Sequence, residues 1–139
     1  MTPEGYRLVE GPPVVEDYLA LRALSGLSPR TADQAVAALP GSWWACHVMH
    51  EESGRSVGMG RLLGDGGWYF HVVDMAVLPD HQRRGLGDLV LGALLDRIRA
   101  RAPAGAYVNL LADGPGRGLY ARHGFVETAP TSVGMARTI

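Results

Sequence analysis

The stretch Asp74-Met-Ala-Val-Leu-Pro-Asp-His-Gln-Arg-Arg-Gly-Leu-Gly87 decides the fold of this chain. Its apolar first half continues a run from Trp68 to Leu78, which is typical of a strand covered on both faces. Pro79 ends that strand, a short polar loop follows, and Gly85 and Gly87 open a helix. The sequence therefore predicts a strand–loop–helix junction. The first amides of the helix lack intrahelical partners there and lie beside the positive end of the helix dipole.

Such a junction is suited to an anion, because glycines let the backbone approach the ligand closely and Arg83 and Arg84 add positive charge. A pyrophosphate group fits this arrangement. A Gly-x-Gly pair alone is equally typical of a plain strand-to-helix turn. The dinucleotide fingerprint Gly-x-Gly-x-x-Gly/Ala is not matched, because its third position falls on Val90.

The helix after the junction is predicted by apolar side chains on one face, namely Leu86, Leu89, Val90, Ala93, Leu94 and Ile98. Pro103 ends it, and a strand follows at Tyr107–Ala112, so we expect a right-handed crossover between two parallel strands. Gly114-Pro115 begins a short helix that ends at His123-Gly124.

The remaining segments complete a mixed sheet. Two helices are expected before the junction, one from Val15 to Gly26 and one from Ser28-Pro29 to Ala38. Further strands are expected at Tyr6–Glu10, Trp43–Met49, Ser56–Leu63, Phe125–Val126 and Val133–Ala136. The sequence thus predicts one α/β domain over residues 1–139, with a mostly antiparallel sheet of about seven strands and about four helices.

Composition excludes several classes of function. The chain has 139 residues and a net charge of −1, which gives no general attraction to nucleic acid or to an anionic membrane. All 13 cationic side chains are Arg, which excludes a Schiff-base lysine and the lysine of a P-loop. The single cysteine, Cys46, excludes an intramolecular disulfide and a zinc ribbon. No signal peptide or apolar span of membrane length is present, so we expect a cytoplasmic protein.

Two motifs carry a family resemblance. Gln82-Arg83-Arg84-Gly85-Leu86-Gly87 resembles the Gln/Arg-x-x-Gly-x-Gly/Ala acyl-CoA loop of the GNAT acetyltransferases, and Leu119-Tyr-Ala-Arg-His-Gly-Phe125 is similar to the family's helix with a tyrosine followed by Gly-Phe. The motifs occur in the family's order and at about its spacing, and the resemblance covers Val57 to Val126. It implies direct transfer of an acetyl group from acetyl-CoA to an amine, without a metal or a covalent intermediate, and a possible homodimer.

The resemblance also implies roles for individual residues. The loop Gln82–Gly87 would hold the pyrophosphate, and the pantetheine arm would pair with the backbone of Met75, Ala76 and Val77 as a peptide pairs with a strand edge. Asp113 stands where many members have an Asn that contacts the cofactor arm, but an ionised Asp can accept hydrogen bonds and not donate them. Tyr120 would lie near the cofactor sulfur, where its phenol can protonate the departing thiolate.

Direct transfer also needs a group that accepts the proton of the amine. Asp74 is a carboxylate in an otherwise apolar strand, and His71 of the same strand is a side chain suited to proton exchange near neutral pH. Strand alternation puts these two residues on opposite faces, so only one can face the cleft unless the strand carries a bulge. A water held by backbone carbonyls is a third possibility.

The residues that bind the acceptor are the part of the site that the sequence indicates least clearly. Trp68 and Tyr69 flank a turn and could line it, and Asp65 could hold a cationic acceptor or pair with Arg61. A small-molecule amine is favoured over a protein amine because no docking module is evident. The alternatives are an acyl-CoA sensor without catalysis and, less favoured, a nucleotide-binding domain that uses the same loop.

Overall fold

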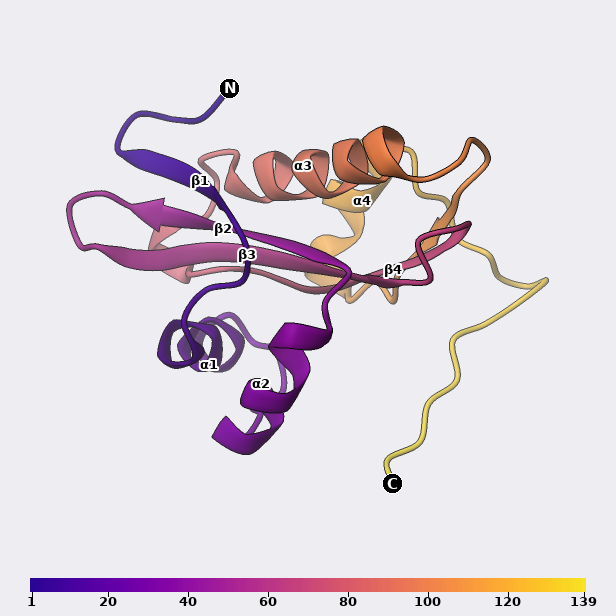
Figure 1. Ribbon diagram of the computed structural model, residues 1–139, viewed down its shortest axis with the longest axis horizontal. Coiled ribbons are helices and arrows are strands. Elements are labelled where there is room, and N and C mark those ends of the chain that lie inside the picture. Colours follow the sequence, from indigo (N-terminus) through magenta and orange to yellow (C-terminus); the bar gives the residue numbers. More distant parts are fainter.

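The computed structural model describes all 139 residues, which form a five-stranded sheet whose spatial order follows the sequence (Figure 1). The strands are β1 (Tyr6–Glu10), β2 (Trp44–His50), β3 (Arg55–Gly64), β4 (Tyr69–Val77) and β5 (Tyr107–Asn109). Strands β1 to β4 form antiparallel pairs, whereas β5 lies parallel to β4. The structure thus confirms the parallel pair predicted around the long helix.

Helices cover both faces of the sheet. They are α1 (Val15–Leu24), α2 (Ala32–Ala38), α3 (Leu86–Arg101) and α4 (Arg117–Arg122). Figure 1 shows α3 and α4 on one face and α1 and α2 on the other. Short 3-10 turns lie at Leu39–Gly41, Pro79–His81 and Gly114–Gly116. No helix combines the length and the apolar character that a membrane crossing would require.

The hydrophobic core is divided by the sheet. On one side, Phe70 and Val72 of β4 pack with buried residues of α3 such as Val90 and Leu94. On the other side, Ala76 of β4 packs with Tyr18, Leu21, Ala35, Leu39 and Met59. Strand β4 is therefore covered on both faces, as its apolar run predicts.

A bulge in β4 changes which side chains face which layer. Arg61 of β3 pairs with Val73, but Met59 pairs with Ala76, so β4 has one residue more than β3 between these pairs. Asp74 lies in this bulge with φ of 60°, one of only two residues other than glycine with positive φ. Beyond the bulge, Met75 and Val77 pack on the α3 side. On that side Met75 lies over Gly60, where a Cβ would stand 2.7 Å from its Sδ.

The sheet has five strands, so the prediction of about seven was wrong. Residues 125–126 and 133–136 pair with no strand, and Val126, Val133 and Met135 are largely exposed. Their β-forming side chains find no partner edge, because β5 ends at Asn109 and the chain then leaves β4. Phe125 instead packs its ring edge-on against Tyr120.

The second helix also begins later than predicted. Its cap is Thr31 rather than Ser28, and Thr31 and Gln34 form a reciprocal capping box. Ser28 instead accepts two hydrogen bonds from Arg22, which fixes the loop between α1 and α2.

Candidate active site

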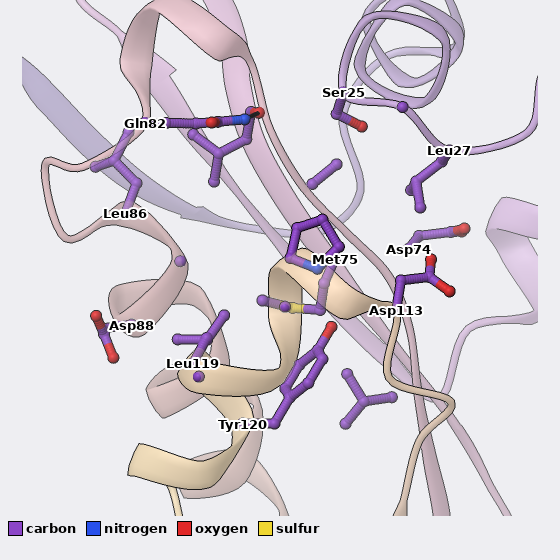
Figure 2. A pocket seen from close by; sticks show the side chains of 18 of the residues that line it. Ser25, Leu27, Asp74, Met75, Gln82, Leu86, Asp88, Asp113, Leu119 and Tyr120 are labelled. Atoms are coloured by element: carbon purple, nitrogen blue, oxygen red, sulfur yellow. Dashed lines mark hydrogen bonds between the residues drawn. The ribbon is translucent and has the colours of Figure 1, made fainter.

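A cleft of about 1020 Å³ lies where β4 and β5 separate. The two strands pair only from Tyr69 to His71 and from Tyr107 to Asn109, and then diverge. The second half of β4, the start of α3, α4 and the α1–α2 loop line the cleft (Figure 2). A parallel pair that opens in this way exposes the edge of one strand to a ligand.

The exposed edge belongs to Val72–Val77 of β4. Beyond His71 no strand pairs with it on the β5 side, so an extended ligand can reach its backbone. Met75, Ala76 and Val77, the residues predicted to hold the pantetheine arm, line the cleft here. Gln82 donates a hydrogen bond from Nε2 to the Val77 carbonyl at 3.0 Å, which ties the following loop to the strand end.

The loop ends in unpartnered amides at the start of α3. Gly85 is the N-cap in the left-handed region with φ of 81°, and no side chain caps the helix. The first amide bonded back to it is that of Leu89, at 3.0 Å from the Gly85 oxygen. The amides of Leu86, Gly87 and Asp88 therefore have no backbone acceptor. They lie at the positive end of a 16-residue helix, which suits a pyrophosphate.

Two further features fit that loop to an anion. Gly87 backs onto α4 so closely that a Cβ would stand 3.2 Å from Leu119 Cδ2. Arg83 lines the cleft and adopts positive φ of 62°, whereas Arg84 is not among the lining residues. The structure thus brings the glycines of the predicted loop and Arg83 to the cleft.

Tyr120 reaches the cleft from α4. Figure 2 shows its ring projecting toward Met75 and Asp113, and its hydroxyl has no hydrogen-bond partner in the protein. Burial raises the pKa of Tyr120, and the negative charge of Asp113 raises it further. The phenol therefore keeps its proton across the neutral range and is available as a donor.

Asp74 is fully engaged in hydrogen bonds, which disagrees with the predicted role of a base. Its Oδ2 accepts hydrogen bonds from Tyr18 and from Nε of Arg61, both at 2.7 Å, and its Oδ1 pairs with Arg22. Burial alone would raise the pKa of Asp74, but these hydrogen bonds and the two positive charges outweigh burial and hold the pKa below its ordinary value. A carboxylate held in this way is a poor proton acceptor.

The bulge places His71 on the same face as Asp74, against the alternation that the sequence predicts. Phe70 and Val72 face α3, so His71 faces the α1 side, where Asp74 meets Tyr18. His71 Nδ1 lies 2.5 Å from Oδ1 of Asn109, whose Nδ2 donates to the Tyr69 hydroxyl at 2.7 Å.

With the amide of Asn109 oriented as the structure has it, this pair of contacts favours one tautomer of the histidine. Because Asn109 donates through Nδ2, its Oδ1 must accept, so His71 Nδ1 carries the proton. Nε2 of His71 is then a free acceptor, with no partner in the protein. Asn109 was not predicted, although its place opposite His71 in the register is what orients the imidazole.

The predicted acceptor residues do not line the cleft. Asp65 Oδ1 accepts from the amides of Gly67, Trp68 and Tyr69, at 2.8, 3.0 and 3.1 Å. The amides of Trp68, Gly67 and Tyr69 lower the pKa of Asp65. Asp65 therefore stabilises the turn in which it lies, at the end of β4 away from the cleft. Trp68 is exposed beside that turn. The prediction that Asp65, Trp68 and Tyr69 form the pocket therefore does not fit.

The cleft is also lined by residues that sequence reasoning did not assign to the site, namely Ser25, Gly26, Leu27 and Leu111. One signal in the sequence could have indicated them. Arg22 is a cation among apolar residues of α1, and a buried cation needs an acidic partner. Asp74 is the isolated acid in β4, so this pair would have placed the end of α1 beside the cleft. Figure 2 shows Asp74 on the side of the cleft where Ser25 and Leu27 lie.

Three acids line the cleft, and only one has no cationic partner. Asp74 is paired with Arg22 and Arg61, and Asp88 with Arg122 and His123. Asp113 has none, and it lies close enough to raise the pKa of Tyr120. No three histidine, cysteine or acidic side chains gather in a way that would hold a metal ion.

Comparisons with known proteins agree on the family. A family model described as an acetyltransferase (GNAT) domain matches residues 42–127. A probable acetyltransferase from meticillin-resistant Staphylococcus aureus is 36% identical, with a TM-score of 0.90 over 96% of this chain and 99% of the other. A GNAT family acetyltransferase from Streptococcus pneumoniae is 25% identical, with a TM-score of 0.77 over 96% and 97%.

Glucosamine-6-phosphate N-acetyltransferase from Arabidopsis thaliana shares the fold at 17% identity, with a TM-score of 0.74 over 97% of this chain and 99% of the other. A search of curated protein sequences found no significant match.

Replacing Gly87 by Glu should abolish CoA binding, because the side chain would displace Leu119 and put negative charge at the unpartnered amides. Ala100→Glu is the matched control, since it makes the same charge change at the exposed far end of α3. Calorimetric titration with CoA measures both variants. Equal affinity of Gly87→Glu and the control, with both folded, would remove the loop from the binding site.

Proposed function

The chain belongs to the GNAT family of acetyltransferases, and from this premise we propose that it moves the acetyl group of acetyl-CoA to the primary amine of a small molecule. The GNAT fold implies acetyl-CoA as co-substrate. The observation that carries the proposal is the continuity of one cleft. It runs from the unpartnered loop amides, along the open edge of β4, to the unpartnered hydroxyl of Tyr120.

The charges of the cleft support an amine as acceptor. Asp113 is the one lining acid without a cationic partner, and it attracts an ammonium group to the neighbourhood of Tyr120. We therefore propose that Asp113 holds the acceptor rather than the cofactor arm. The homodimer and the cytoplasmic location that the sequence suggests stay predictions.

The proposed chemistry is a direct transfer in which His71 and Tyr120 move the protons. Nε2 of His71 takes a proton from the ammonium, and the amine then attacks the thioester carbonyl carbon. A C–N bond forms, the C–S bond breaks, and Tyr120 gives its proton to the sulfur. The new amide nitrogen then releases its second proton, which restores the phenol of Tyr120, and His71 returns its proton to water. Cys46 is no candidate acyl carrier, because burial raises the pKa of its thiol to about 12.

The whole proposal is tested by thiol release from acetyl-CoA with a panel of small amines and with lysine-bearing peptides. We expect steady turnover with at least one small amine and little with the peptides. Preference for peptides would indicate a protein acceptor. Tight binding of acetyl-CoA without turnover on any amine would indicate a sensor and contradict the proposal.

His71→Gln should lower the rate and abolish its fall on the acid side of the pH–rate profile, because the amide cannot take a proton. General base catalysis is worth on the order of 100- to 10,000-fold, so we expect a loss in that range. Asn109→Leu, which frees the tautomer but keeps the imidazole, should give a smaller loss with the acid limb retained. An unchanged profile in His71→Gln would move the base to a bound water.

Tyr120→Phe should lower kcat while the affinity for acetyl-CoA stays nearly unchanged. The ring keeps its packing on Gly116 and Phe125, and the lost hydroxyl acts only when the thiolate departs. A fall of roughly 100-fold or more is expected from general acid catalysis. Thiol release at saturating acetyl-CoA gives the rate, and calorimetry gives the affinity. Wild-type turnover would leave Tyr120 a packing residue.

A further inference from the structure

Four polar side chains meet inside the protein next to the cleft. Asp74 of β4 accepts hydrogen bonds from Tyr18 and Arg22 of α1 and from Arg61 of β3. The Asp74 side chain is 2% exposed, and those of Arg22 and Arg61 are 9% and 7% exposed. One carboxylate thus joins the helix layer to two strands, in a place where little water can compete with its partners.

The backbone at Asp74 needs this support. A residue other than glycine at φ of 60° is strained, and such a conformation persists only where the surroundings fix it. The three donors hold both carboxylate oxygens of Asp74, so they fix its side chain and with it the bulge. Without the bulge, Met75 and Val77 would turn away from the α3 side. The edge that faces the cleft would then present different backbone groups.

The same carboxylate also controls the other wall of the cleft. Arg22 pairs with Asp74 through Nη1 and donates from Nε and Nη2 to the carbonyl and the hydroxyl of Ser28, at 2.9 and 3.0 Å. The residues just before Ser28, Ser25 to Leu27, line the cleft. Arg22 therefore ties the α1–α2 loop to the bulge.

We propose that Asp74 is a positioning residue of the transfer site: through Arg61 and Tyr18 it holds the β4 edge, and through Arg22 it holds the acceptor wall at a fixed place beside that edge. This inference rests on the proposed function for its kinetic consequences. Asp74 takes no proton in the reaction. Its charge serves the shape of the cleft, in which a small misplacement of the reacting groups slows transfer strongly.

The test compares Asp74→Asn with Asp17→Asn. Asp17 is a second buried acid, bonded to Arg55 at 2.8 Å and to the amide of Ser56 at 3.0 Å, and it does not line the cleft. Asn at position 74 keeps the shape of the side chain and tolerates positive φ, but it loses the charge. Both variants should melt at a lower temperature than the wild type.

Below both melting temperatures, Asp74→Asn should lose on the order of 10- to 100-fold in kcat/KM for the amine, while Asp17→Asn keeps the wild-type value. The acid limb of the pH–rate profile should remain in Asp74→Asn. Loss of that limb would make Asp74 the base and overturn the proposal. Equal kinetics of the two variants would also overturn it, because both acids would then contribute to stability alone.

Two arginine variants separate the two walls. Arg22→Met should raise the KM for the amine with little change in CoA affinity, because it frees the α1–α2 loop. Arg61→Met should weaken CoA binding, because it frees the β4 edge. If both variants changed the KM for the amine and the affinity for CoA to the same extent, the assignment of Arg22 to one wall and of Arg61 to the other would be wrong.

Hydrogen exchange tests the proposal without any turnover. Amides of residues 72–77 and 25–28 should exchange faster in Asp74→Asn than in Asp17→Asn, with and without CoA. If the wild type turns over no amine, the proposed function fails while this comparison still decides the positioning role. If amide protection in Asp74→Asn equalled that in Asp17→Asn at both segments, the positioning role of Asp74 would be wrong even in an active enzyme.

The stability that Asp74 contributes should also depend on pH in a defined direction. The pKa of Asp74 is lowered on folding, so its contribution is present above the unfolded value of about 4 and is lost as pH falls through the lower folded value. The gap in melting temperature between wild type and Asp74→Asn should therefore narrow in acid. A gap independent of pH would contradict the charged state of Asp74.

Discussion

A carboxylate buried in a protein must find positive charge and hydrogen-bond donors there, because it cannot keep its water. Asp74 meets this requirement with Tyr18, Arg22 and Arg61, which come from α1 and β3. Satisfying one charge therefore fixes how α1 docks on the sheet and where β4 bends. The cleft lies beside that bend, since β4 leaves β5 directly after His71 and exposes its own edge.

Local features of the chain were predictable because their causes are local. The glycines and arginines before α3 act through backbone freedom and charge at one strand–loop–helix junction, so the loop Gln82–Gly87 could be found by its spacing. The parallel order of β4 and β5 followed from the helix between them. The sequence also identified Asp74 and His71, an acid and a base in an otherwise apolar part of β4, as residues that needed an explanation.

Features that depend on distant partners were not predictable in the same way. Counting residues along β4 puts His71 and Asp74 on opposite faces, but a bulge held by side chains of α1 and β3 brings them to one face. The prediction of strands at residues 125–126 and 133–136 was wrong for a similar reason, because β-forming residues become a strand only beside a free edge. Asp65 was assigned to a ligand although the amides of its own turn already used its oxygen.

In the proposed reaction, the division of charge in the cleft gives each ionisable group a separate task. An alkyl amine is protonated at neutral pH, with a pKa of about 10, so it arrives as a cation and must lose its proton before it can attack. Asp113 can attract that cation because no arginine neutralises it, whereas Asp74 cannot because two arginines do. A paired carboxylate is also a weak base, so the proton needs another acceptor. His71 meets this need: the amide of Asn109 holds the proton on Nδ1 and leaves Nε2 free. Taking up a second proton makes the imidazole a cation, and the phenol of Tyr120, whose pKa is raised by burial and by Asp113, remains able to supply a proton to the sulfur.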